Sequence, residues 1–328
     1  MITVKHVSKI YKSHVRQNNL FKDIFFRKFK EHEAVKDISF DIDHNELIGF
    51  IGPNGAGKTS TLKMLAGILY PSKGSISVLG QTPFDKKPAF LKQIAFIMGQ
   101  RNQLIWDLPA HDSFELQRAV YEIDEQAYKK TLSHLLSILN CEDLIQKPVK
   151  TLSLGERMKM ELIAGLLHQP KLVFLDEPTI GLDIFSQEAI RIFIKEYQQT
   201  YKATVILTSH YLEDVKKLAK RLIIIHKGTI MYDGSLKDII EQYSTEKKIK
   251  ITLEEKVSEE KIKAIGTPSS YKYPQLVYSV KRAELLEKIK NISSSLPFSD
   301  LTVEDASIEE VIKMFFSEKK EERNKKEE

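Results

Sequence analysis

Along the first part of the chain, apolar residues gather in short runs separated by stretches with helical spacing. Runs of strand length occupy residues 2–7, 36–51, 172–175, 204–208, 222–226 and 229–232. Between them, apolar positions recur with helical periodicity, most clearly in 58–66, 114–123 and 132–139, and the pattern over 88–165 is mainly helical. Strands that alternate with helices predict an α/β fold with a mostly parallel sheet.

The pattern changes after Gln242. Strands are predicted at 248–253 and 276–280, and helices at 259–265, 283–292 and 307–316. The last residues are almost all charged, which is typical of a disordered tail. We therefore expect a first domain over 1–240 with a helical subdomain at about 88–165, a small α+β domain over 241–316, and a disordered tail over 317–328.

Composition narrows the class of protein. The 328 residues are 42% hydrophobic and 29% charged, which fits a soluble globular protein of about two domains. The net charge of +5 is mild for this length and gives no argument for nucleic acid. No run approaches the ~18 apolar residues of a membrane span, and no secretory signal is visible. The single cysteine, Cys141, is expected to be a packed residue in a reducing compartment, and the histidines lack metal-ligand spacing.

A glycine-rich segment follows the apolar run 47–51 and opens a predicted helix. It fits the phosphate-binding pattern Gly-x-x-x-x-Gly-Lys-Thr, in the context that this pattern requires. Glycines allow the backbone to wrap around phosphates, and the amides at the helix N-terminus point towards negative charge. We expect Lys58 to reach the β- and γ-phosphates, Thr59 to ligate Mg²⁺, and Ser60 to bond a further phosphate oxygen. The segment consists of Gly52, Pro53, Asn54, Gly55, Ala56, Gly57, Lys58 and Thr59.

Two carboxylates end the apolar strand predicted at 172–175. Asp176 is a candidate Mg²⁺ ligand, and Glu177 is a candidate general base that orients and deprotonates the attacking water. Carboxylates that merely cap the next helix are the alternative interpretation. The phosphate-binding segment upstream favours the catalytic one.

A short segment before this strand narrows the family. Residues 152–157 read Leu-Ser-Leu-Gly-Glu-Arg, and Ser153 with Glu156 also forms a capping box at a predicted helix start. With the preceding motifs, this segment resembles the signature Leu-Ser-Gly-Gly-Gln of the nucleotide-binding subunits of ATP-binding cassette (ABC) transporters. Ser153 and Gly155 match that signature, whereas Leu154 and Glu156 depart from it.

The resemblance extends to four further positions in the same order. It implies that 180–183, ending in Asp183, is the D-loop at a dimer interface, and that His210 is the switch histidine near the γ-phosphate. It implies that Gln100 senses both Mg²⁺ and the attacking water, and that Tyr11 stacks on adenine. The fold implied is a P-loop cassette with an antiparallel β subdomain and a helical subdomain, followed by the small α+β domain.

The function implied is hydrolysis of ATP with Mg²⁺ between two facing cassettes, coupled to a separate membrane permease. The second cassette is an identical chain or a close paralogue. Residues 98–109 are similar to the branch whose partners are ABC-2-type permeases, often exporters. The implied location is peripheral, on the cytoplasmic face of the membrane, without nucleic acid. A soluble ABC ATPase acting on ribosomes or DNA, and a non-enzymatic nucleotide sensor, are the alternatives. The first is disfavoured by the single cassette, and the second by the presence of Glu177 and His210.

The sequence leaves open the role of the stretch 12–35 and of Trp106. Leu20, Phe21, Ile24, Phe25 and Phe29 share one helical stripe within the basic stretch 12–35, which indicates a short amphipathic helix. It is interpreted either as packed on its own domain or as resting on a membrane surface or permease. Trp106 lies where the family contacts the permease, and core packing is the equal alternative.

Overall fold

The computed structural model describes residues 1–15, 28–99, 102–209, 211–243, 246–305 and 308–327. Its contacts divide the chain into two compact units, Met1–Ser235 and Leu236–Glu328. Each unit has its own hydrophobic core.

A six-stranded sheet forms the centre of the first unit. Its order is β5-β6-β7-β3-β8-β9, and only the β8–β9 pair is antiparallel. Both faces of the sheet are covered, so β6 and β7 are buried along their whole length, as their continuous apolar runs predict. The strands are β3 (Leu47–Ile51), β5 (Ile94–Met98), β6 (Leu172–Asp176), β7 (Thr204–Thr208), β8 (Arg221–His226) and β9 (Thr229–Ser235).

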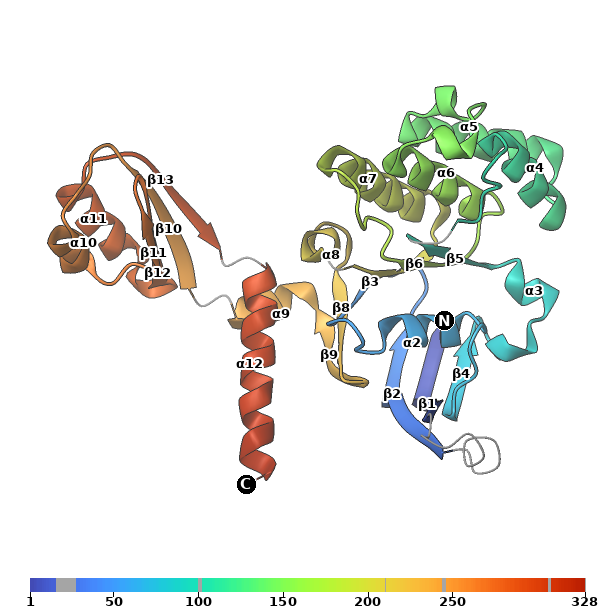
Figure 1. Cartoon of the computed structure of the whole chain (residues 1–328), viewed down its shortest axis with the longest axis horizontal. Coiled ribbons are helices and arrows are strands. Elements are labelled where there is room, and N and C mark those ends of the chain that lie inside the picture. The colour runs from blue at the N-terminus through green and yellow to red at the C-terminus, as the bar shows by residue number, and fades with distance from the viewer. Residues whose placement is uncertain (16–27, 100–101, 210, 244–245, 306–307, 328) are drawn as a thin grey trace. The chain divides into compact units, whose positions relative to one another are not determined.

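Successive side chains of β6 enter two different cores. Phe174 packs in a core with the antiparallel sheet, whereas Val173 and Leu175 pack in a core with the helices of the opposite face. The helices of the unit are α2 (Lys58–Leu65), α3 (Pro88–Leu91), α4 (Ala110–Val120), α5 (Glu125–Leu139), α6 (Leu154–Leu166), α7 (Ile184–Tyr201) and α8 (Leu212–Leu218). Figure 1 shows α4, α5, α6 and α7 gathered on one side of the sheet and α2 on the other. The segment 88–165 is mainly helical, as predicted, and its apolar run 94–98 is the parallel edge strand β5.

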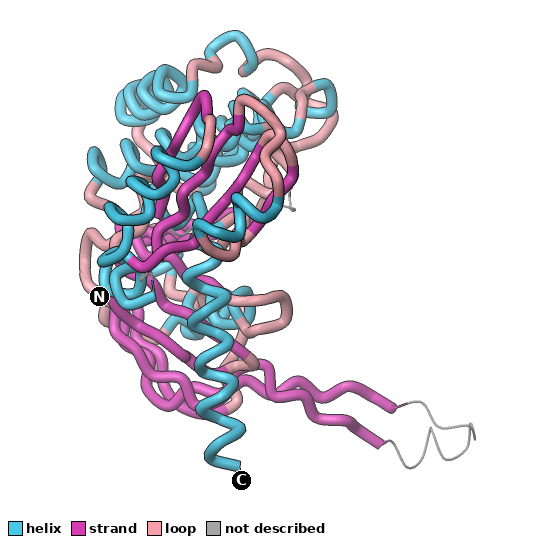
Figure 2. Tube along the Cα trace, turned by 90° about the vertical axis from the view of Figure 1, so that its left-hand side faces the viewer, coloured by secondary structure: helices cyan, strands magenta, loops and turns pink. Residues whose placement is uncertain are grey.

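A three-stranded antiparallel sheet, in the order β2-β1-β4, completes the unit. Its strands are β1 (Ile2–Val15), β2 (Lys28–Ile42) and β4 (Lys73–Val78). Beyond the pairing with β4, β1 and β2 continue as a two-stranded ribbon, which Figure 2 shows in profile. The amphipathic helix expected within 12–35 falls mainly on 16–27, outside the described residues. The expected helical stripe ends at Phe29, and at this described residue the expectation was wrong, because Phe29 pairs with His14 as part of β2.

The second unit contains a four-stranded antiparallel sheet in the order β11-β12-β10-β13. Two of these strands, β11 and β13, were not predicted from the sequence. The disordered tail was also a wrong expectation, because α12 continues through it to Glu327. The elements are α9 (Leu236–Tyr243), β10 (Glu246–Leu253), α10 (Glu259–Ile265), β11 (Ser270–Lys272), β12 (Gln275–Lys281), α11 (Leu285–Ser295), β13 (Phe298–Asp305) and α12 (Ile308–Glu327).

Candidate functional site

The phosphate-binding segment forms a tight loop between β3 and α2. Gly57 caps α2 with φ 111°, and this N-cap position makes no side-chain capping hydrogen bond. A Cβ at Gly57 would lie 2.6 Å from the carbonyl oxygen of Ala34, so only glycine fits there. The free amides of the first helical turn therefore remain available to an anion.

Lys58 folds its side chain back over this loop. Its Nζ donates to the carbonyl oxygens of Gly52 at 2.7 Å and Pro53 at 3.2 Å. Burial lowers the pKa of Lys58, and the nearby carboxylates of Glu177 and Asp176 oppose that shift. The ammonium is thus held at the loop by neutral carbonyls, which a phosphate would outcompete because it carries charge.

Asp176 connects three elements at the carboxyl edge of the parallel sheet. Its Oδ2 accepts from Thr59 Oγ1 at 3.0 Å, and its Oδ1 accepts from Thr208 Oγ1 at 2.6 Å. Thr208 ends β7, which neighbours β6, so the carboxyl ends of these strands meet here. Two of the residues expected at the metal, Thr59 and Asp176, are therefore in direct contact.

Glu177 follows with a strained backbone, at φ 56°. Its N–H donates to the carbonyl oxygen and the hydroxyl of Thr208, each at 3.1 Å. Gly99 packs so closely that a Cβ there would lie 2.1 Å from the carbonyl oxygen of Glu177. These contacts fix the backbone of Glu177 immediately beside the phosphate loop.

A cavity of about 340 Å³ opens over the loop. Tyr11 stands at its edge, where its hydroxyl lies 3.1 Å from Ser60 Oγ and Lys9 Nζ lies 5.4 Å from its ring centroid. His32 also lines the cavity, since the ribbon register places it opposite Tyr11, and sequence reasoning missed it. The described lining residues are Tyr11, His32, Ala34, Asn54, Gly55, Ala56, Gly57, Lys58, Thr59, Ser60 and Glu177.

The signature segment lies elsewhere, at the start of α6. The predicted capping box is present, with Glu156 N–H donating to Ser153 Oγ at 3.3 Å and Ser153 N–H donating to Glu156 Oε2 at 2.8 Å. Gly155 abuts α7, where a Cβ would lie 2.2 Å from Ser186 Oγ. Among the described lining residues of the loop cavity, none comes from this segment.

Asp183 caps α7. It accepts from Ser186 N–H at 2.9 Å and from Ser186 Oγ at 2.6 Å, and these hydrogen bonds lower the pKa of its carboxyl. Asp183, like Ser153 and Gly155, is not among the residues described around the loop cavity. Gln100 and His210 lie outside the described residues.

Comparison with known proteins identifies the family. The model of the family "ABC transporter" matches residues 35–180. The ABC transporter ATP-binding protein NatA of Bacillus subtilis (strain 168) is 35% identical over 225 residues, which cover 68% of this chain and 90% of NatA. The chain belongs to the ABC transporter ATP-binding proteins.

Further similarities agree with this family. The linearmycin resistance ATP-binding protein LnrL of Bacillus subtilis (strain 168) is 32% identical over 227 residues, or 69% of this chain and 72% of LnrL. A solved ATP-binding subunit of an ABC transporter superposes with a TM-score of 0.61 at 26% identity, covering 74% of this chain and 92% of that one. The family and the cassette fold predicted from the sequence are confirmed, and the chain is an ABC-type ATPase.

Proposed function

We propose that this cassette hydrolyses ATP with Mg²⁺ and thereby drives substrate export through a separate, ABC-2-like membrane permease. One observation carries the proposal: the two carboxylates at the end of β6, Asp176 and Glu177, lie at the same phosphate loop that contains Lys58 and Thr59, although the two motifs are far apart in the sequence. In this arrangement the loop amides, Lys58 and Ser60 hold the phosphates, and Tyr11 stacks on the adenine.

The residues at the loop fit a magnesium ion. Thr59 Oγ1 and Asp176 Oδ2, 3.0 Å apart, are hard oxygen donors of the kind Mg²⁺ prefers. Mg²⁺ bound there would neutralise charge on the β- and γ-phosphate oxygens. Gln100 is proposed as a further ligand from the family resemblance.

Glu177 is proposed as the general base. Its carboxylate takes a proton from water while the water oxygen bonds to the γ-phosphorus and the bond to the β–γ bridging oxygen breaks, releasing ADP. Lys58 holds the phosphates in line during this step, and His210 is proposed to contact the γ-phosphate.

A second cassette is proposed to complete each site. Ser153, Gly155 and Asp183 are not among the described residues that line their own phosphate-loop cavity, and exposed apolar side chains are their neighbours in the sequence. Leu154 is 39% exposed, Ile184 78% and Phe185 87%. Apolar surface of this kind marks an interaction site. We propose that an identical chain or a close paralogue covers it and receives ATP against Ser153 and Gly155.

A different surface suits the permease. A groove of about 290 Å³ is lined by residues that include Ile68, Leu91, Phe96 and Tyr121. Ile68 is 55% exposed and Leu91 40% exposed. We propose that a permease segment docks on this groove.

Trp106 is a separate case. It is 45% exposed, and the guanidinium of Arg157 lies 5.4 Å from its ring centroid, so Trp106 is not a buried core residue.

Among the described residues, no helix combines the length and apolar content needed to cross a bilayer. We propose a peripheral location on the cytoplasmic face of the membrane, without a nucleic-acid partner. The export direction is supported by the resistance function named for LnrL.

Purification of the tagged chain from its native membranes in mild detergent, followed by mass spectrometry, tests this proposal. A co-purifying multi-span permease is expected. Ile68→Glu and Leu91→Glu should release it without changing ATP affinity, whereas Leu286→Glu, at an exposed apolar position of the second unit, should retain it. Recovery only with ribosomal or DNA-associated partners would overturn the transporter assignment.

A further inference from the structure

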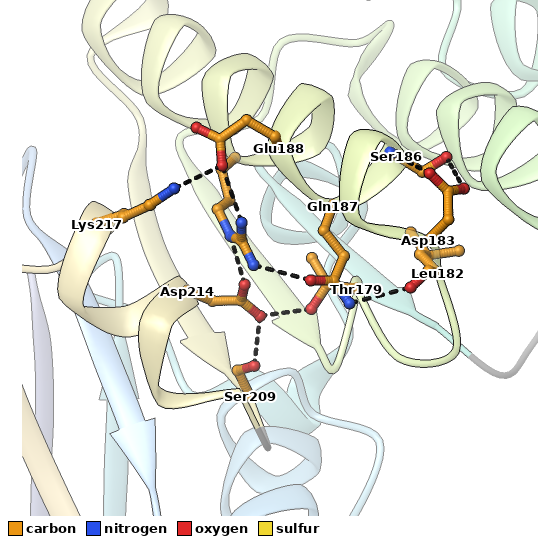
Figure 3. A network of polar contacts seen from close by, with 10 residues as sticks. Thr179, Leu182, Asp183, Ser186, Gln187, Glu188, Ser209, Asp214 and Lys217 are labelled. Carbon is orange, nitrogen blue, oxygen red and sulfur yellow. Dashed lines mark hydrogen bonds and ion pairs between the residues drawn. The ribbon is translucent and has the colours of Figure 1, made fainter. Parts of the chain in front are cut away.

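Asp214 is a fully buried carboxylate in α8, outside the site described above. Its Oδ2 accepts from two hydroxyls, Thr179 Oγ1 at 2.5 Å and Ser209 Oγ at 2.6 Å. Figure 3 shows the Asp214 side chain facing both of them. Because the two hydroxyls donate to the same oxygen, neither segment can move away without leaving a buried acceptor short of a partner.

Each of the two hydroxyls belongs to a segment that carries a residue with a proposed role at the nucleotide. Thr179 lies in the connection between Glu177 and Asp183, and Ser209 directly precedes His210. One side chain therefore joins the loop proposed to face the second cassette to the segment proposed to face the γ-phosphate.

A guanidinium balances the charge of Asp214. Arg191 Nε donates to Asp214 Oδ1 at 2.6 Å, and Arg191 is itself only 7% exposed. Removing one partner of such a buried pair is strongly unfavourable, so the arrangement resists rearrangement.

Arg191 also anchors the network in α7. Its Nη1 donates to Glu188 Oε2 at 2.9 Å, and its Nη2 donates to Gln187 Oε1 at 3.0 Å. Gln187 Nε2 in turn donates to the carbonyl oxygen of Leu182 at 3.0 Å, next to Asp183. The connection from Asp214 thus reaches the D-loop by two routes, through Thr179, which directly precedes it, and through Gln187 of α7, which contacts Leu182 (Figure 3).

We propose that Asp214 is a positioning residue that couples the D-loop to the switch segment, so that the two shift together when a second cassette docks. It acts through Thr179 and Ser209, not by touching nucleotide. The inference rests on the roles proposed above for Asp183 and His210.

Hydrogen–deuterium exchange of the full chain tests the coupling without requiring turnover. In Asp214→Asn, amide exchange should rise at least about tenfold in both 177–183 and 208–211, and stay unchanged in β3 and β6. Glu188→Gln is the matched control, because it removes the negative charge that pairs with Arg191 and Lys217 but no contact to Thr179 or Ser209, and it should leave both segments unchanged. A rise in only one segment, a global rise, or no rise would overturn the proposal.

A double-mutant cycle gives a second readout and does not depend on the folding of Asp214→Asn. Thr179→Val and Ser209→Ala should each lower kcat by about tenfold with KM nearly unchanged, and the double variant should lose less than the product of the two effects. Independent, multiplicative effects, or a change in thermal stability without a change in kcat, would contradict the coupling. If the parent chain hydrolyses no ATP, the proposed function fails while the exchange experiment still decides this inference.

Discussion

The hydroxyl of Thr59 donates to the carboxylate of Asp176 over 3.0 Å, which joins the first turn of α2 to the end of β6. Two oxygen atoms that could both ligate Mg²⁺, from segments far apart in the chain, thus lie next to each other. Asp176→Asn keeps the shape of the side chain but removes its charge, so we expect the Mg²⁺ dependence of ATP affinity to weaken by about tenfold or more. Titration calorimetry with and without chelator measures this. Equal Mg²⁺ dependence in both proteins would exclude Asp176 from the metal site.

Glu177→Gln should retain ATP binding and lose turnover. An amide cannot accept the proton of the attacking water, so kcat should fall by about 10²–10⁴-fold. Steady-state ATPase assays and nucleotide titration test the two halves of this prediction. Near-normal turnover would remove Glu177 as the general base.

Phe185→Glu should abolish ATP-dependent dimerisation. The side chain is 87% exposed, and a charge there would be buried without a partner in the proposed dimer. Light scattering with ATP, in a Glu177→Gln background, should show a monomer, whereas Leu286→Glu should still dimerise. ATP affinity of the monomer should not change. A dimer that persists in Phe185→Glu would place the contact surface elsewhere.

Gly155→Ala should destabilise the first unit even without nucleotide. The new Cβ would lie 2.2 Å from Ser186 Oγ, and overpacking of this kind costs about 1–3 kcal/mol. Ser186→Gly makes room, so the double variant should lose less unfolding free energy than the sum of the single variants. Chemical denaturation measures all three. Strict additivity would show that α6 and α7 are not in contact here.

Acid should destabilise the protein through His168. Burial lowers the pKa of His168 to about 4, and its Nδ1 has no hydrogen-bond partner among the described residues. Its Nε2 lies 3.0 Å from the carbonyl oxygen of Ile94, which fits the neutral ring as a donor.

The unfolded chain therefore binds a proton at higher pH than the folded chain does. The contribution of neutral His168 to the free energy of unfolding is complete above pH ~6.5. It is lost as the pH falls towards ~4, by at most about 3 kcal/mol. The slope of unfolding free energy against pH reports how many more protons the unfolded chain binds. In His168→Gln this difference should fall by up to about one proton over this window. An unchanged slope would show that His168 is not the group responsible.

Local patterns in the sequence were enough for the loops that begin helices. The phosphate loop and the capping box at Ser153 each depend on residues within a few positions, and the described backbone has both. The parallel sheet could likewise be predicted, because continuous apolar runs are a local feature of strands buried on both faces. The C-terminal tail is an exception. Its charged residues predicted disorder, whereas in the structure it continues α12.

Pairing between distant segments was beyond the sequence. The register of β1 with β2 brings His32 opposite Tyr11, and no local pattern specifies it. Asp214 was likewise missed, because its partners Thr179 and Arg191 lie 35 and 23 residues away and look like ordinary polar positions. The sequence by itself determined the family and the chemistry of the loop, since those depend on short spacings. The tertiary structure alone decided which distant side chains share a buried carboxylate, because that depends on how strands and helices pack.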